Sequence, residues 1–422
     1  MYIAEMITRS IVETWKQGEN ILIEAQTGSG KSSFMLNDFA QYCKEHNLKA
    51  LLFSNRDLLK KQNKKLAPDN IDCYNYQYIE KLSPENIKSF LLQYDIMLFD
   101  ECHYFFKDSN FNENTDKILD YAKTSEKQIK IFASATPEPL YYTGIKFNHE
   151  YHVPHNYSFI RKLIFYDNMS DIIKEIETNS AKSLCFLSNT GEACKYALTH
   201  NKTTSFICSK SNTLWRISDQ EAAKKLIETS KFDTKILMAT TVIDNGINIV
   251  DREVKNVVID FHDQINIIQP LGRKRIQPGE EIVLYLKRPT QKEINQGRFA
   301  NPSGKSQAAI IYRKFLSDYY RTIDKMGYMY YWMNYFGIPE EKIECRTTYT
   351  QLREFLKSRA NQEIQKEELE KEFRRIMPIK ENARICTYNN FLKKNLIPYE
   401  IVSERYYNNN KTRKRRWIVR DV

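Results

Sequence analysis

The chain has 422 residues, with 64 Lys and Arg against 53 Asp and Glu, and its formal net charge is +11. Residues 1–290 hold 37 basic and 37 acidic side chains, whereas residues 291–422 hold 27 basic and 16 acidic ones. The whole excess therefore lies in the last third. This excludes a uniformly basic packaging protein and favours a neutral body with an appendage for an anionic partner.

Residues 1–157 alternate strand-like apolar runs with helical segments, as βα units do. Strands are expected at 20–25, 50–54, 95–100 and 129–133, and helices at 31–46 and 57–65. The pattern restarts over residues 158–290, with strands expected at 162–166, 183–187, 204–208, 235–239, 254–260 and 281–286. Helices are expected between them at 172–178, 192–200 and 219–229. The fold class is thus α/β, with two parallel-sheet domains in tandem.

Residues 291–422 form a third, mainly helical accessory region with a different composition. A polar linker is expected at 291–307, an aromatic helical pair at 308–336 and a charged helical stretch at 348–376, of which 363–372 reads as a solvated face. We expect the aromatic side chains of the pair to form a packed core rather than a platform for stacking bases.

Other features exclude several classes of protein. With 41% hydrophobic and 13% aromatic residues the chain can build packed cores. No apolar run approaches the roughly 20 residues of a membrane helix, and no signal peptide is visible, so we expect a cytoplasmic protein without membrane association. The eight scattered cysteines lack a C-x-x-C pair, which argues against disulfides and a four-cysteine metal site. His149, His152 and His155 are interpreted as part of a polar linker rather than as metal ligands.

Residues 25–32 (AQTGSGKS) lie between an expected strand and an expected helix, the context that a phosphate-binding loop requires. Glycines allow backbone N–H groups to converge on phosphate oxygens, and the helix N-terminus adds its dipole. Lys31 is placed to reach the β- and γ-phosphates, and Ser32 is placed to ligate Mg²⁺. The candidate residues of this ATP site are Ala25, Thr27, Gly28, Ser29, Gly30, Lys31 and Ser32.

Residues 100–103 (DECH) end an apolar run about 70 residues after this loop. An acid at the carboxyl end of a neighbouring parallel strand is able to hold Mg²⁺, so Asp100 is the second metal candidate. The adjacent Glu101 is the candidate that orients and deprotonates an attacking water.

With these two motifs the chain resembles superfamily 2 helicases and translocases of the DEAD/DEAH-like kind, here with a DECH box. Further motifs follow in order over residues 1–290. They are SNRDLL (54–59), a possible Ib motif at 76–77, SAT (134–136), FLSNT (186–190), ATTVIDNGI (239–247) and QPLGRKR (269–275). The resemblance implies RecA-like domains at 1–157 (motifs I–III) and 158–290 (motifs IV–VI), with ATP and Mg²⁺ between them.

The resemblance also implies roles for individual residues. From the second domain, Gly246 would bind nucleotide, while Gln269, Arg273 and Arg275 would act on the γ-phosphate with Lys31, Asp100 and Glu101. Residues that would couple hydrolysis to domain movement are His103, Ser134 and Thr136. Residues that would face nucleic acid are Ser54, Arg56, Ser188, Thr240 and Thr241, mostly as phosphate contacts.

Two departures from the family pattern bear on the substrate. The usual final arginine of motif VI would fall at Ile276, and the second arginine is Arg275 instead. This form resembles that of some phage and viral helicases, which would act in the cytoplasm of an infected bacterium. No glutamine motif precedes residue 25, so a DEAD-box RNA helicase proper is less favoured.

Residues 384–422 are expected to form a winged-helix-like unit, with a helix at 387–395 and strands at 400–407 and 412–420 around an Asn-rich turn. Its helix would enter a groove and its basic hairpin would grip phosphates. The basic candidates of the hairpin are Arg413, Arg415 and Arg416. A solvated basic tail is the alternative.

Together these features predict a nucleic-acid-stimulated ATPase that moves on or unwinds DNA, single-stranded or forked, in replication, recombination or repair. An RNA helicase with the same chemistry is one alternative. A non-motor initiator or loader that binds DNA and is switched by ATP is the other.

Overall fold

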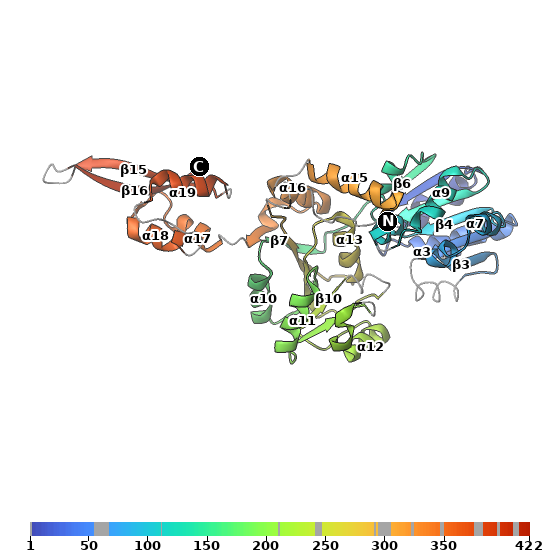
Figure 1. The fold of residues 1–422 in the computed structure, drawn as a ribbon, viewed down its shortest axis with the longest axis horizontal. Helices are drawn as coiled ribbons and strands as arrows, with labels where there is room; N and C mark the ends of the chain where they lie inside the picture. Colours follow the sequence, from blue (N-terminus) through green and yellow to red (C-terminus); the bar gives the residue numbers. More distant parts are fainter. Residues whose placement is uncertain are drawn as a thin grey trace. The chain divides into compact units, whose positions relative to one another are not determined.

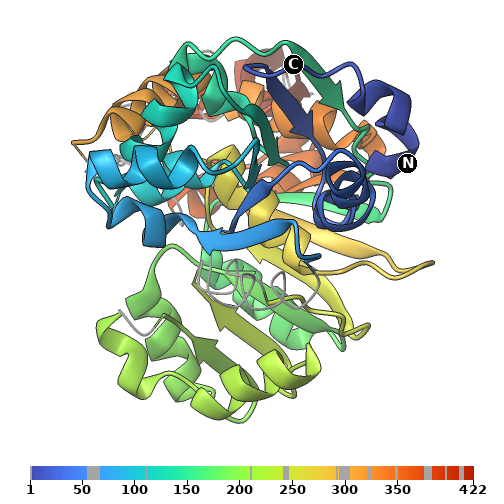
Figure 2. The same ribbon diagram turned by 90° about the vertical axis from the view of Figure 1, so that its right-hand side faces the viewer.

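The computed structural model describes residues 2–54, 67–110, 112–209, 212–240, 247–290, 293, 305–321, 325–346, 350–374, 383–394, 397–407 and 413–422. Their contacts divide the chain into two compact units. Unit 1 comprises Met1–Phe165 and Ile173–Glu344, and unit 2 comprises Tyr166–Ile172 and Cys345–Val422. Unit 1 contains two separate sheets, which we call the first lobe and the second lobe (Figure 2).

The sheet of the first lobe has six strands in the order β3-β2-β4-β5-β1-β6, and all its neighbours pair in parallel. Its strands are β1 (Asn20–Glu24), β2 (Ala50–Ser54), β3 (Ile71–Asn75), β4 (Ile96–Asp100), β5 (Ile129–Ser134) and β6 (His149–His152). Its helices are α1 (Ile3–Met6), α2 (Arg9–Val12), α3 (Lys31–Ser33), α4 (Phe39–Glu45), α6 (Tyr76–Glu80), α7 (Pro84–Leu91), α8 (Tyr104–Lys107) and α9 (Thr115–Thr124). A π-helical turn, Phe34–Asp38, joins α3 to α4, and short 3₁₀ turns lie at Asp108–Asn110 and Glu138–Thr143.

Both faces of this sheet are covered, because successive side chains of a strand point to opposite faces. On one face Phe53, Phe99 and Phe132 stack across adjacent strands, with ring centroids 4.9 and 4.7 Å apart. On the other face Leu52 and Leu98 pack with the helices that follow β1. The apolar runs predicted as strands are therefore buried on both sides.

The sheet of the second lobe has seven strands in the order β13-β7-β12-β11-β8-β10-β9. They are β7 (Ile160–Tyr166), β8 (Lys182–Phe186), β9 (Thr204–Ile207), β10 (Ile236–Ala239), β11 (Val254–Ile259), β12 (Ile282–Lys287) and β13 (Ile343–Arg346). The helices of this part are α10 (Met169–Thr178), α11 (Thr190–Thr199), α12 (Gln220–Thr229) and α13 (Gln264–Arg273), with a 3₁₀ turn at Thr213–Ile217. β12, β11, β8, β10 and β9 pair in parallel. The prediction of two α/β domains in tandem, each built on a parallel sheet, is confirmed.

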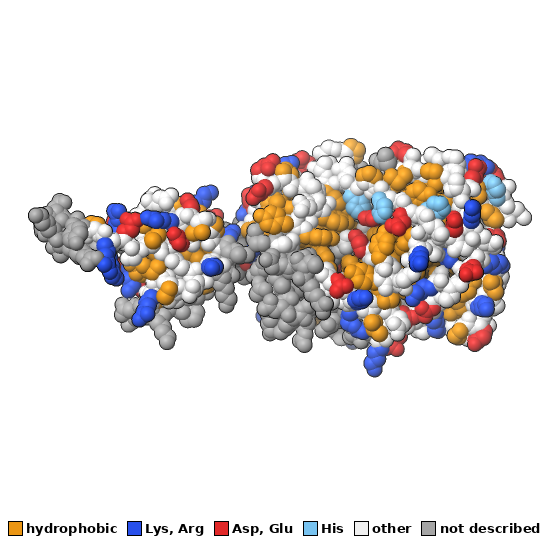
Figure 3. All heavy atoms as spheres, turned by 90° about the horizontal axis from the view of Figure 1, so that it is seen from above, with side chains coloured by type: hydrophobic (Ala, Val, Ile, Leu, Met, Phe, Trp, Pro, Cys, Tyr) orange, Lys and Arg blue, Asp and Glu red, His pale blue; other side chains and the backbone are white. Residues whose placement is uncertain are grey.

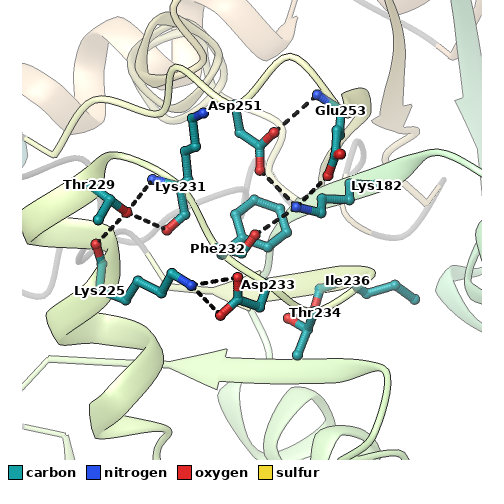
Figure 4. Close-up of polar contacts among 10 residues, drawn as sticks. All are labelled: Lys182, Lys225, Thr229, Lys231, Phe232, Asp233, Thr234, Ile236, Asp251 and Glu253. Carbon is teal, nitrogen blue, oxygen red and sulfur yellow. Dashed lines mark hydrogen bonds and ion pairs between the residues drawn. The ribbon is translucent and has the colours of Figure 1, made fainter.

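An ion-pair network closes the amino edge of this second sheet (Figure 4). Lys182, at the start of β8, donates to the carbonyl of Phe232 at 2.8 Å and to Asp251 at 3.0 Å, and it also pairs with Glu253 at 2.7 Å. The network holds Asp251 and Glu253 at the amino ends of the strands, the edge of the sheet opposite their carboxyl ends.

Two aromatic helices, α15 (Gln307–Arg321) and α16 (Lys325–Phe336), complete unit 1, followed by a 3₁₀ turn at Glu340–Lys342. Tyr328 and Trp332 are fully buried, whereas Tyr330 is exposed. The expectation of a packed aromatic core is thus confirmed for the buried members. The Tyr312 hydroxyl of α15 donates to Asp263 at the start of α13 at 3.1 Å, so α15 also supports the second lobe.

Unit 2 has its own small core and a three-stranded antiparallel sheet in the order β14-β16-β15. Its elements are α17 (Thr350–Ser358), β14 (Glu363–Ile364), α18 (Lys366–Arg374), α19 (Ile385–Lys394), β15 (Tyr399–Tyr407) and β16 (Arg413–Asp421). Figure 1 shows β15 and β16 as a hairpin beside α19. The core joins residues of every element, among them Leu356, Ile364, Phe373, Tyr388 and Val419.

Two local expectations were wrong. The helical stretch predicted over 348–376 is interrupted, because residues 363–364 leave the helix to pair with Trp417 and Ile418 of β16. The segment expected to be a polar linker contains β6, since His149–His152 pairs in parallel with β1. His149 and His152 contact Glu19 and Glu24 at 3.1 and 2.7 Å, and Figure 3 shows histidines beside acidic side chains. Within the described residues no cluster of metal-binding side chains is found.

All eight cysteines are free thiols. No helix among the described residues is both long and apolar enough to cross a membrane.

Candidate active site

The loop between β1 and α3 has the backbone of a phosphate cradle. Gly28 and Gly30 adopt φ of 92° and 91°, a left-handed conformation that favours glycine. Gly30 directly precedes α3, so the N–H groups of the first helical turn point toward the loop. The Ser29 hydroxyl donates to the carbonyl of Gln26 at 2.7 Å, which closes the turn.

Lys31 is buried beneath this loop with only 6% of its surface exposed. Its Nζ donates to the carbonyl of Ala25 at 2.9 Å and lies 3.8 Å from Oε1 of Glu101. The lysine charge therefore lies between the loop and the acidic motif at the end of β4.

The ends of three adjacent strands are joined by backbone hydrogen bonds. The N–H of Ala25, after β1, donates to the carbonyl of Ser134 at 3.0 Å, and the N–H of Cys102, after β4, donates to the carbonyl of Ala133 at 3.1 Å. The end of β5 thus links the phosphate loop to the DECH segment.

Ser32 and Asp100 form a pair of oxygen ligands beside the loop. The Ser32 hydroxyl donates to Oδ2 of Asp100 at 3.4 Å, and Oδ1 of Asp100 is buried without a partner. Oxygen donors of this kind fit Mg²⁺, which is bound through one or two carboxylates together with substrate phosphates. When bound, the metal would neutralise charge on the phosphates, and Ser32 and Asp100 would hold it.

The pKa values of the two adjacent carboxyl groups are shifted in opposite directions. Burial, followed by the charge of Glu101, raises the pKa of Asp100 to about 7. Burial opposes ionisation of Glu101 as well, but Lys31, His103 and Arg273 together hold the pKa of Glu101 below its usual range. Glu101 therefore keeps a negative charge and is able to accept a proton. It also adopts φ of 53°, a strained conformation of the kind found at functional sites.

His103 connects three motifs. Its Nδ1 lies 3.1 Å from Oγ of Ser134, 3.3 Å from Oε2 of Glu101 and 3.3 Å from Nε2 of Gln269. Burial lowers the pKa of His103, which favours the neutral ring. The Ser134 hydroxyl also accepts the N–H of Thr136 at 3.0 Å. All three residues predicted to couple hydrolysis to movement thus lie in one buried group.

Helix α13 brings the second lobe to this site. Gln269 and Arg273 are 1% and 7% exposed, and the charge of Arg273 acts on Glu101. Arg275, just beyond α13, donates from Nε to Oδ1 of Asn248 at 2.8 Å. A methyl group at Gly28 would lie 3.1 Å from Nη1 of Arg275, so this guanidinium lies against the phosphate loop.

The two lobes approach each other closely at Gly272. A methyl group at this position would lie 2.7 Å from Cβ and 2.6 Å from Oγ1 of Thr27, distances that no side chain tolerates. Beside this contact is a cavity of about 580 Å³, lined from both lobes by residues that include Tyr2, Gly28, Asn156, Leu271 and Arg275. Its size is that of a small-ligand pocket.

The predicted nucleic-acid residues are only partly grouped. Ser188 and Thr240 follow the carboxyl ends of the paired strands β8 and β10. The exposed Ser188 donates to Asp260 at 2.6 Å. Ser54 ends β2 and is buried. Arg56, Thr241 and Gly246 lie outside the described residues, as does the side chain of Arg413. In unit 2, Arg415 is exposed, while Arg416 pairs with Glu404 at 3.0 Å.

Sequence reasoning missed three contributors. Asn248 holds Arg275, Gly272 permits the contact with Thr27, and Glu138 accepts a hydrogen bond from Gln264 of α13. Gly272 lies inside motif VI, but its spacing does not show which atoms approach it. The other two pairs join residues 27 and 126 positions apart, for which the sequence carries no signal.

Comparisons with known proteins find one family match and similar solved structures. A sequence model of the family "Type III restriction enzyme, res subunit" matches residues 2–90, which contain the phosphate loop. No curated protein sequence matches the chain. The family match supports the resemblance to superfamily 2 helicases that the ordered motifs carry.

Solved structures similar to this chain include two of Dbp5 from S. cerevisiae bound to RNA and ADP BeF3. A variant matches at 14% identity and a TM-score of 0.47, and another Dbp5 structure at 12% and 0.44; each match covers 81% of this chain and 89% of that one. The DEAH/RHA helicase HrpB from Escherichia coli matches at 13% identity and a TM-score of 0.46, over 70% of this chain and 44% of that one.

Replacing Gly272 by Ala should lower the rate of ATP hydrolysis by about 100-fold, because the added methyl group would push α13 away from the phosphate loop and misplace Arg273. Steady-state turnover measures this. Gly191→Ala in α11 is the matched control, since its methyl group would meet only Oδ1 of Asn189 at 3.6 Å. Wild-type turnover in Gly272→Ala would show that the working enzyme does not bring the lobes this close.

Glu138 should make stability depend on pH. Burial raises its pKa to about 7, so between about pH 4.5 and pH 7 the folded chain binds more protons than the unfolded chain. The free energy of unfolding should therefore fall as the pH rises through this window, by up to about 3 kcal/mol. Glu138→Gln keeps the shape and should lose this part of the dependence. Parallel denaturation curves at pH 5 and pH 8 measure it, and identical pH dependence in both proteins would contradict the assignment.

Proposed function

We propose that this chain is an ATP-dependent DNA helicase or translocase whose ATP hydrolysis is stimulated by nucleic acid. One observation carries the proposal: Glu101, His103 and Gln269, from two lobes, meet in one buried group beside Lys31. In this proposal residues 1–157 and 158–290 are the motor, and residues 291–422 are an accessory region that ends in a winged-helix-like grip. Its work would belong to replication, recombination or repair.

Each residue of the group has a distinct task in hydrolysis. Lys31 and the loop N–H groups bind the β- and γ-phosphates of ATP, and the ionised Glu101 accepts the proton of the attacking water. Arg273 and Arg275 act as fingers on the charge that develops at the γ-phosphate. A finger of this kind commonly contributes about 10³–10⁵ in rate.

Movement follows from the same contacts. Gln269 reaches His103, and His103 reaches Ser134, so a change at the γ-phosphate alters how α13 sits on the first lobe. Closing on ATP and opening after hydrolysis would shift Ser188 and Thr240 relative to the first lobe. An alternating grip on a nucleic-acid backbone at these positions produces translocation.

DNA is proposed as the substrate because of the chemistry of unit 2. Its helix α19 exposes Thr387, Asn390 and Lys393, and the major groove of B-form DNA admits a helix. The major groove of A-form RNA is too narrow for side chains to read.

ATP turnover should rise when single-stranded DNA is added. It should be abolished by Lys31→Ala and Glu101→Gln, which remove the phosphate ligand and the base. Turnover measured with DNA and RNA of matched sequence gives the preferred nucleic acid. Absence of turnover in the wild-type chain, or turnover unaffected by either substitution, would refute the motor. Stronger stimulation by RNA would make it an RNA helicase.

Ending the chain at Arg346 should weaken binding to DNA and lower its salt dependence, while basal ATP turnover persists. This boundary keeps β13 in its sheet and removes β14 together with the hairpin. A cut at residue 384 would instead divide the core that the elements of unit 2 share. Unchanged DNA affinity in the shortened chain would favour the alternative, in which the basic segment is a solvated tail without a role in DNA binding.

A further inference from the structure

The hairpin of unit 2 has two faces of different character. Ile401 of β15 lies opposite Val419 of β16, and both are buried in the core of unit 2. Alternate residues of a strand share a face, so Arg405 and Arg415, which also lie directly opposite each other, occupy this same face farther along the hairpin. We call it the inner face.

On the outer face, Arg416 and Arg420 already share an acidic partner. There Glu404 pairs with Arg416 at 3.0 Å and also with Arg420, and the Arg416 guanidinium lies 5.7 Å from the ring of Tyr406. Arginines held in this way are less available to an outside anion.

Arg405 and Arg415 have no such compensation. Both side chains are exposed, and among the described residues no carboxylate forms an ion pair with either of them. Directly opposed like charges repel each other across a strand pair, whereas an anion between them converts the repulsion into attraction. The chain thus keeps an arrangement that an anionic ligand would stabilise.

Helix α19 is fixed to this inner face. Tyr388 and Leu392 share the core with Ile401 and Val419. The Asn389 side chain accepts the N–H of Ile401 at 2.7 Å and donates to its carbonyl at 2.9 Å, so α19 and β15 are held in register. The side of α19 directed away from the core exposes Thr387, Asn390 and Lys393.

We propose that Arg405 and Arg415 form a phosphate clamp for one strand of double-stranded DNA whose major groove receives the exposed side of α19. The inference rests on the proposed function in taking DNA as the ligand. A phosphodiester between two guanidiniums forms charge-assisted hydrogen bonds. Asn390 and Lys393 are residue types that read adenine and guanine in the major groove. The outer-face arginines take no part.

The test uses the full chain and a fluorescent 20-base-pair DNA duplex, with binding followed by anisotropy over a range of salt concentrations. Arg405→Ala and Arg415→Ala should each weaken binding several-fold and reduce the salt slope by about 1, as loss of one phosphate contact does. Arg420→Ala is the matched control from the outer face and should leave the slope unchanged. An equal loss in Arg420→Ala, or no loss in the inner-face variants, overturns the clamp.

Further measurements separate this inference from folding defects and from the motor. Thermal unfolding of Arg405→Gln should occur no earlier than in the wild-type chain, because the substitution relieves repulsion; an earlier transition would mean that Arg405 supports the fold. An RNA duplex of the same sequence should bind more weakly, and equal affinity would overturn groove entry by α19. If DNA does not stimulate turnover by the wild-type chain but the inner-face variants still lose duplex binding, the motor is refuted and the clamp is retained. If DNA stimulates turnover by the wild-type chain but the inner-face variants bind the duplex as well as the wild-type chain does, the clamp is refuted and the motor is retained.

Discussion

Parallel pairing of β1, β5 and β4 is the constraint on which the candidate active site depends. Parallel strands end at the same edge of their sheet, so the residues that follow these three strands meet although they lie about 75 and 35 positions apart. The phosphate loop follows β1, Asp100 ends β4 with Glu101 directly after it, and Ser134 ends β5. Hydrogen bonds from Ala25 and Cys102 to the end of β5 fix the three segments against one another.

Burial then assigns different roles to chemically similar groups. Asp100 and Glu101 are neighbours in sequence, yet the pKa of Asp100 is raised while that of Glu101 is lowered. The difference comes from position: the basic residues lie close to Glu101, whereas Asp100 has a hydroxyl partner in Ser32. Glu101 is therefore ionised, whereas Asp100 has a buried carboxyl that a bound cation would stabilise in its charged form.

The second lobe contacts the candidate active site through close packing and a small number of hydrogen bonds. Gly272 lets α13 approach Thr27 without a side chain between them, and Asn248 holds Arg275 against the loop. α15 supports α13 from the other end through Tyr312 and Asp263. In the proposed motor, a change in nucleotide state would move α13 as a rigid element, because packed contacts do not deform continuously.

The sequence alone determined the two parallel-sheet lobes, the phosphate loop, the acidic motif and the hairpin, because hydrophobic period, glycine spacing and turn residues are local signals. It did not determine β6, β14, the contact of Gly272 with Thr27 or the division of the hairpin arginines into a paired and an unpaired face. Each of these depends on which distant segment becomes the neighbour: Ile364 is a strand residue only because Trp417 lies beside it, and Arg416 is neutralised only because the strand register places Glu404 opposite. Tertiary packing decides such neighbours, and with them the charge that each arginine can offer.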